Sequence, residues 1–176
     1  MSSIRTFACG AILALSFAGA ASAADTEADG AKAAVNALVG CWKGAGQVKG
    51  TPTDNDVVVT PRLDGKYLTV AVTSRDPKNP YRAVVILAWA GGRRLTSFWM
   101  DTFGGEYSAA GSGAVASDGA LEITYPYPDA DFVNTFIRSG NGLFWEIVEK
   151  KHGAPSRNFA TYSLFPVSCD GKHADF

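Results

Sequence analysis

Apolar and polar residues alternate along most of the chain after residue 41, with the period of two that is typical of half-buried β-strands. Residues 66–74 (KYLTVAVTS) place Leu68, Val70 and Val72 on one face and polar side chains on the other. We therefore expect an all-β domain. The predicted strands begin at Cys41 and continue at residues 81–90, 95–101, 121–125, 132–138, 143–151 and 159–165.

Turn signals between these segments indicate how the strands connect. Asp64-Gly65, Asp118-Gly119 and Asn141-Gly142 are dipeptides favoured in tight hairpins, because both turn positions need a positive φ. Nine or ten short strands joined by such turns predict an antiparallel meander. Closure into an up-and-down barrel would remove its two exposed edges. Glycines two residues apart, at 44 and 46 and at 111 and 113, are expected where the barrel coils sharply.

Residues 1–23 are predicted to be a cleavable signal peptide. Arg5 precedes an uncharged apolar run over residues 7–20, and the small residues at 21 and 23 suit signal peptidase. The apolar run is shorter than the roughly 20 residues that a membrane-spanning helix needs. Residues 24–37 are expected to hold a loose leader over 24–30 and the start of a short helix over 31–39, which ends at Gly40. Residues 38–176 then form the barrel domain of a periplasmic or secreted protein.

Two cysteines remain after cleavage, Cys41 at the start of the first predicted strand and Cys169 after the last. Thiols of exported proteins tend to pair, so a disulfide between them is expected to join the two ends of the barrel. Free thiols or a metal site are the alternatives, although no histidine stands at metal-ligand spacing from either cysteine. The net charge of −1, without a strong basic cluster, predicts no nucleic-acid partner.

The first predicted strand opens with the sequence GCWKGAG at residues 40–46, directly after the short helix. This Gly-x-Trp opening resembles the calycin superfamily, which includes the lipocalins. It is also similar to uncharacterised bacterial lipocalin-like domains, whose later Gly-Lys-Tyr and Trp-x-Asp motifs correspond to residues 65–67 and 99–101 here. The resemblance implies a barrel floor in which Trp42 stacks on a basic residue of the last strand, for which Arg157 is the candidate.

The same opening resembles that of the nitrobindins, barrels that bind haem through a histidine near the C-terminal strands. The two histidines of this chain are His152, in a predicted hairpin tip, and His173, in a polar tail. The resemblance therefore implies haem only as an alternative ligand. The leading expectation is a barrel without a cofactor.

An aromatic set on the predicted strands is suited to line a cavity for a small, partly apolar or amphipathic ligand, with polar anchors at strand ends. The same aromatic residues could instead fill a solid core, in which case loops or a strand edge would bind a protein partner. No hydrolase, zinc-protease or phosphate-loop motif is present, so we expect neither catalysis nor a metal. The candidate ligand-binding residues are Arg82, Trp89, Trp99, Asp101, Tyr107, Tyr125, Phe136, Arg138, Trp145 and Tyr162.

Overall fold

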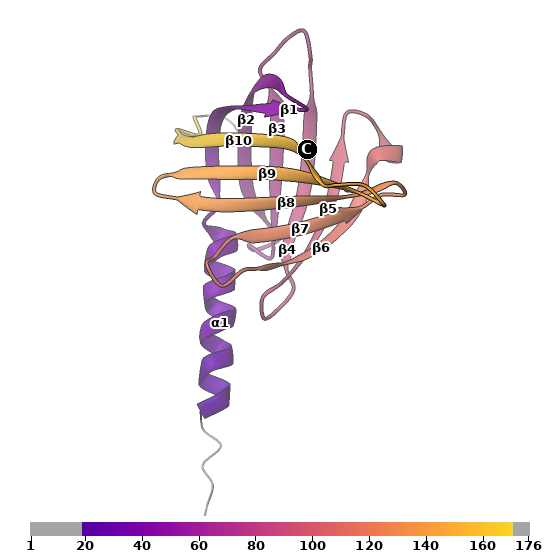
Figure 1. Ribbon diagram of the computed structural model, residues 1–176. Coiled ribbons are helices and arrows are strands. Elements are labelled where there is room, and N and C mark those ends of the chain that lie inside the picture. The colour runs from indigo at the N-terminus through magenta and orange to yellow at the C-terminus, as the bar shows by residue number, and fades with distance from the viewer. Residues whose placement is uncertain (1–18, 171–176) are drawn as a thin grey trace, which may run out of the picture.

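The computed structural model describes residues 19–170, which form one α-helix, one short 3-10 helix and ten strands (Figure 1). Residues 1–18 of the predicted signal peptide lie outside the described residues, as does His173. Within residues 19–170, no helix combines the length and the apolar character that crossing a membrane requires. The elements are α1 Gly19–Asn36, β1 Gly40–Val48, β2 Thr51–Arg62, β3 Tyr67–Ser74, β4 Arg82–Trp89, β5 Arg94–Asp101, η1 Gly105–Tyr107, β6 Ala109–Val115, β7 Leu121–Pro126, β8 Ala130–Ser139, β9 Gly142–Lys151 and β10 Arg157–Val167.

Each strand pairs antiparallel with its neighbour in sequence, and the barrel closes where β1 pairs with β10. Beside this seam the Cys41–Cys169 disulfide joins β1 to the residues after β10. The predicted all-β meander barrel and the predicted disulfide are thereby confirmed. A link across 128 residues stabilises the fold by about 4–5 kcal/mol when the lost entropy of the unfolded chain is counted.

The two ends of the barrel differ, and the packed core occupies one of them. At the closed end, which carries the β8–β9 turn, inward residues such as Leu68, Leu87 and Leu121 are almost fully buried. The other end, which we call the mouth, carries the β1–β2 and β9–β10 turns and leads into a cavity. On β4, whose two faces are both apolar, the inward side belongs to Ala83, Val85 and Leu87.

Strand β2 is absent from the strands predicted by alternation. Its first half, residues 51–56 (TPTDND), carries few apolar side chains. These residues pair with the mouth end of β1, where inward positions line the cavity rather than the core. Only further along the strand do Val57 and Val59 enter the core.

Helix α1 is longer than predicted and starts earlier. Residues 24–30, expected to be a loose leader, are helical, because this stretch belongs to an alanine-rich run with high helix propensity. The predicted helix over 31–39 ends at Asn36, and Gly40 begins β1 with φ 140° instead of stopping the helix. Ala31 and Val35 are buried against the closed end, and Glu27 pairs with Arg93 at 2.8 Å.

The floor of the barrel contains Trp42, but its cationic partner is Arg138 and not Arg157. The Arg138 guanidinium lies 4.6 Å from the centroid of the Trp42 ring, and the Trp42 Nε1–H donates to the Leu38 carbonyl at 2.9 Å. Arg157 fails as the partner because β9 runs from the closed end to the mouth. As the first residue of β10, Arg157 therefore lies at the mouth, where it pairs with Glu149.

Glycine permits close approach of neighbouring strands at the positions that the sequence singled out. A Cβ at Gly44 would lie 1.9 Å from the Ser163 carbonyl oxygen, and one at Gly113 would lie 1.8 Å from that of Glu122. Both obstacles are backbone atoms, which cannot rotate away as a flexible side chain can. These glycines let the sheet coil tightly enough to close.

We predict that Gly44→Ala destabilises the barrel by about 2–3 kcal/mol, because the new methyl group overlaps backbone across the β1–β10 seam. Gly30→Ala is the matched control. No atom lies within 4 Å of a Cβ at Gly30, which is in α1, so alanine there should leave stability unchanged or raise it by up to about 1 kcal/mol. Urea unfolding measures both variants. A Gly44→Ala protein as stable as the wild type would contradict the close approach.

Candidate functional site

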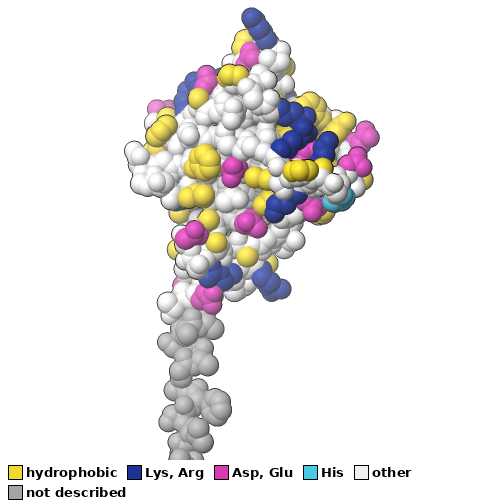
Figure 2. Space-filling view, viewed as in Figure 1, with side chains coloured by type: hydrophobic (Ala, Val, Ile, Leu, Met, Phe, Trp, Pro, Cys, Tyr) yellow, Lys and Arg dark blue, Asp and Glu magenta, His cyan; other side chains and the backbone are white. Residues whose placement is uncertain are grey.

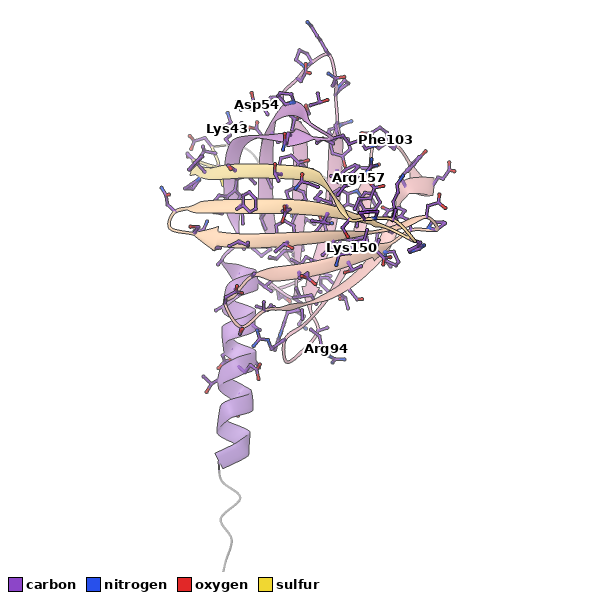
Figure 3. All side chains as sticks on the ribbon, in the orientation of Figure 1. Lys43, Asp54, Arg94, Phe103, Lys150 and Arg157 are labelled. Atoms are coloured by element: carbon purple, nitrogen blue, oxygen red, sulfur yellow. A yellow bond between two sulfur atoms is a disulfide. The ribbon has the colours of Figure 1, made fainter. Side chains whose placement is uncertain are left out.

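A cavity of about 790 Å³ opens at the mouth of the barrel. Its rim is formed by the loops that join alternate strands at this end, including η1. Figure 3 places Arg157, Lys150 and Phe103 toward the mouth, away from Arg94 at the opposite end. The barrel is therefore neither wholly filled nor wholly hollow: the half near Trp42 is packed and the half near the mouth is open.

Four aromatic side chains form the inner wall of the cavity. The Trp145 ring centroid lies 4.9 Å from that of Tyr162 and 6.1 Å from that of Trp99. Trp99 in turn contacts Tyr125 edge-on at 5.7 Å. Beneath this wall, Phe136 stacks on Trp145 at 4.9 Å and belongs to the packed core. The ring contacts thus run from the mouth to the core. Trp145 and Tyr125 are only 1% and 2% exposed, so Trp99 and Tyr162 present the open surface, which suits flat apolar molecules.

The Asp101 carboxylate accepts three hydrogen bonds from neighbouring side-chain and backbone groups, which hold it at the rim. Its Oδ2 accepts from the Tyr81 hydroxyl at 3.2 Å and from the Trp99 Nε1–H at 3.1 Å. Its Oδ1 accepts from the backbone N–H of Phe103 at 2.9 Å. Burial, together with the Asp101 charge, raises the pKa of Tyr81 well above its usual range. The hydroxyl therefore stays protonated and keeps donating to the carboxylate.

A second carboxylate, Glu149, faces the cavity on the opposite part of the wall, with 6% of its side chain exposed. Arg157 donates to Glu149 Oε2, and the Lys151 ammonium lies 3.9 Å from Oε1. The Arg157 hydrogen bond holds the pKa of Glu149 below its ordinary value, against the opposing effect of burial. The carboxylate therefore stays ionised at neutral pH.

The cavity also contains two buried amides that the sequence pattern did not reveal. Asn55 and Asn134 are only 3% and 2% exposed, and both line the cavity. Their signal in the sequence is weak, because a polar residue in an alternating strand is expected to face outward. Asn134 follows the apolar Val133, and its inward direction becomes clear only from the pairing with Ile147.

The ten predicted ligand-binding residues divide into two sets. Phe136 lies in the core, Arg138 covers the floor, Arg82 is exposed on β4, and Trp89 donates to the Gly92 carbonyl at the closed end. These four do not line the cavity, because alternation alone does not tell which face or end of a strand a residue occupies. The residues that do line it are Trp99, Asp101, Tyr107, Tyr125, Trp145 and Tyr162.

Charged residues are unevenly distributed around the cavity. Five carboxylates line it, but only two ammonium groups do, those of Lys49 and Lys151. The cations gather near the β1–β2 and β9–β10 turns, and Figure 2 shows Lys and Arg side chains beside a histidine on this side of the molecule. Asp76, Asp101, Glu106 and Asp129 form an acidic arc around the rest of the rim.

The described residues contain no group of three or more His, Cys, Asp or Glu side chains suited to hold a metal ion. His152, one of the two candidate haem ligands, lies in the β9–β10 turn and is not part of the cavity lining.

Comparison with known proteins finds similarity in structure alone. No protein-family model and no curated protein matches the chain. The structure resembles that of Rv2717c from M. tuberculosis, with a TM-score of 0.60 and 17% identity over 78% of this chain and 97% of that one. It also resembles the S-type phycobiliprotein lyase CPES from Guillardia theta, with a TM-score of 0.50 and 12% identity over 76% of this chain and 90% of that one. These likenesses show a shared barrel fold.

We predict that the stabilising effect of Glu149 depends on pH. A carboxyl whose pKa is lowered in the folded state stabilises it fully above the unfolded pKa, here 4.5, and loses that effect as the pH falls through the folded pKa. The stability difference between the wild type and Glu149→Gln should therefore be largest near pH 7 and shrink as the pH falls below about 4.5. Urea unfolding from pH 3 to pH 8 measures it.

Glu146→Gln is the control for this prediction, because Glu146 lies on the outer side of the same strand and accepts a hydrogen bond from Asn158. If the difference in unfolding free energy between the wild type and Glu149→Gln stays constant from pH 3 to pH 8, the ion pair with Arg157 contributes nothing to folding.

Proposed function

We propose that the protein is an exported, lipocalin-like barrel that binds a small, partly apolar molecule in its mouth cavity without chemically changing it. The observation that carries this proposal is the cavity of about 790 Å³ with a continuous aromatic inner wall. Pockets for small molecules typically measure about 300–1,000 Å³ and combine apolar walls with a few polar groups. The resemblance in fold to other barrels agrees with the proposal but identifies no ligand.

The acidic arc sets the charge of the preferred ligand. Asp76, Asp101, Glu106 and Asp129 have no ion-pair partner among the described residues, whereas Glu149 is already paired with Arg157 and Lys151. The aromatic faces of Phe103 and Tyr107, 5.9 Å apart at the rim, also attract cations. Neutral or cationic ligands are therefore favoured over anions.

Export is supported by two features of the described chain. The Cys41–Cys169 disulfide suits an oxidising compartment. The helix residues that pack on the barrel, Ala31 and Val35, follow the predicted cleavage point after Ala23, so cleavage spares their contacts.

We predict that a cationic aromatic probe binds more tightly than its anionic counterpart. 9-Anthracenylmethylammonium should bind about tenfold more tightly than 9-anthracenecarboxylate at low salt, and the difference should shrink in 1 M salt, because the acidic arc attracts one probe and repels the other. Quenching of tryptophan emission by energy transfer to the anthracene ring measures both affinities.

Two sets of variants locate the bound probe. Trp89→Phe should leave the quenching intact, because Trp89 lies at the closed end, whereas Trp99→Phe together with Trp145→Phe should remove most of it. Glu106→Gln should lower the affinity for the cationic probe about twofold. Glu122→Gln, on the outer face of β7, should leave that affinity unchanged. If neither probe binds, and fatty acids, haem and other aromatic compounds fail as well, the proposed function is wrong.

We predict that the exported protein begins at Ala24. When the whole chain is produced in a bacterium with a periplasm, the mass of the periplasmic protein should equal that of residues 24–176 with one disulfide. Ala21→Asp, which spoils the small-residue cleavage signal, should leave residues 1–23 attached. A cytoplasmic protein of full mass from the unaltered chain would overturn the export proposal.

A further inference from the structure

Trp145 lies at the inner end of the cavity with only 1% of its surface exposed, and two polar side chains flank it. Its indole Nε1–H donates to Asn134 Oδ1 at 3.0 Å, and its ring packs against Tyr162 with centroids 4.9 Å apart. Both flanking residues line the cavity. An amide and a phenol therefore meet the same aromatic surface near the bottom of the cavity.

The hydrogen bond from Trp145 fixes the orientation of the Asn134 amide. Because Oδ1 points at the indole, the NH₂ group points away from it. This NH₂ group donates no hydrogen bond to any described residue, although Asn134 is only 2% exposed. This donor is not enclosed by protein, so a molecule in the cavity can accept its hydrogen bond.

The Tyr162 hydroxyl is a second donor of this kind. Tyr162 is 7% exposed, and its hydroxyl has no hydrogen-bond partner within residues 19–170. Burial raises the pKa of Tyr162 to about 12, so the hydroxyl keeps its proton at neutral pH.

Three other tyrosines of the cavity lining differ in this respect, and a fourth, Tyr107, is 51% exposed at the rim. The Tyr125 hydroxyl lies 2.6 Å from Ser97 Oγ, and the Tyr127 hydroxyl donates to the Tyr107 carbonyl at 2.6 Å. Tyr81 donates to Asp101. In the buried part of the wall, the unused donors thus lie beside Trp145, which indicates a position where an acceptor from a ligand binds.

We propose that Asn134 Nδ2 and Tyr162 Oη donate hydrogen bonds to a carbonyl oxygen of a flat aromatic ligand whose ring lies against Trp99. A carbonyl oxygen has two lone pairs, so it can accept from both donors. A carboxylate is disfavoured at this depth, because burying its charge is costly and carboxylates already line the cavity. The ligand class is therefore an aromatic ketone, quinone or lactam. This inference rests on the proposed function.

The test compares 9-fluorenone with fluorene, a pair of neutral probes that differ only in the carbonyl group. Equilibrium dialysis with the mature protein should give a Kd about tenfold lower for 9-fluorenone. Tyr162→Phe removes only the hydroxyl. It should reduce the ratio of the two Kd values about threefold, mainly by lowering the affinity for 9-fluorenone. Tyr67→Phe, at a half-exposed tyrosine outside the cavity lining, should leave the preference unchanged.

The outcomes separate this inference from the proposed function. Equal affinities for 9-fluorenone and fluorene would overturn the carbonyl site and leave ligand binding intact. The same holds if Tyr162→Phe lowers the affinity for both probes by the same factor. Binding of the anthracene cation without binding of either fluorene compound would also overturn the carbonyl site alone. Failure of every probe would overturn both proposals.

Discussion

The pairing of β1 with β10 is the interaction on which the rest of the structure depends. It turns an open meander into a barrel and so gives every strand an inner and an outer face. Closure demands a tight approach, which Gly44 permits because any side chain there would overlap the Ser163 carbonyl. The disulfide beside the seam holds the same two chain segments together. Without this seam there would be neither a sealed core nor a cavity.

The closed barrel divides its interior unequally along its axis. Near the closed end, Trp42 is buried with the Arg138 guanidinium over its ring, and Ala31 and Val35 of α1 are buried against the barrel. Toward the mouth the inward positions hold polar residues such as Asn55, Asn134 and Glu149, which cannot pack tightly without partners. The packed core and the cavity thus occupy opposite halves of the same strands.

Alternation predicted most of the strands because apolar residues facing a packed core repeat every second position. It missed β2, whose first half is polar, and it hid Asn134 and Glu149, because an inward polar residue beside a cavity has the same pattern as an outward one. The resemblance to the calycins implied Arg157 in the floor, where the structure has Arg138. That choice depends on the end at which each turn lies, which is a property of the strand topology and not of local spacing.

The Cys41–Cys169 disulfide has a consequence for cleavage of the chain by proteases. The mouth loops are the exposed segments around the cavity, and all of them lie between the two cysteines. A single cut in any of these loops therefore yields two pieces that remain covalently joined. The strands of a nicked barrel stay tethered across the β1–β10 seam and can keep their pairing, so one cleavage event need not release or unfold either half.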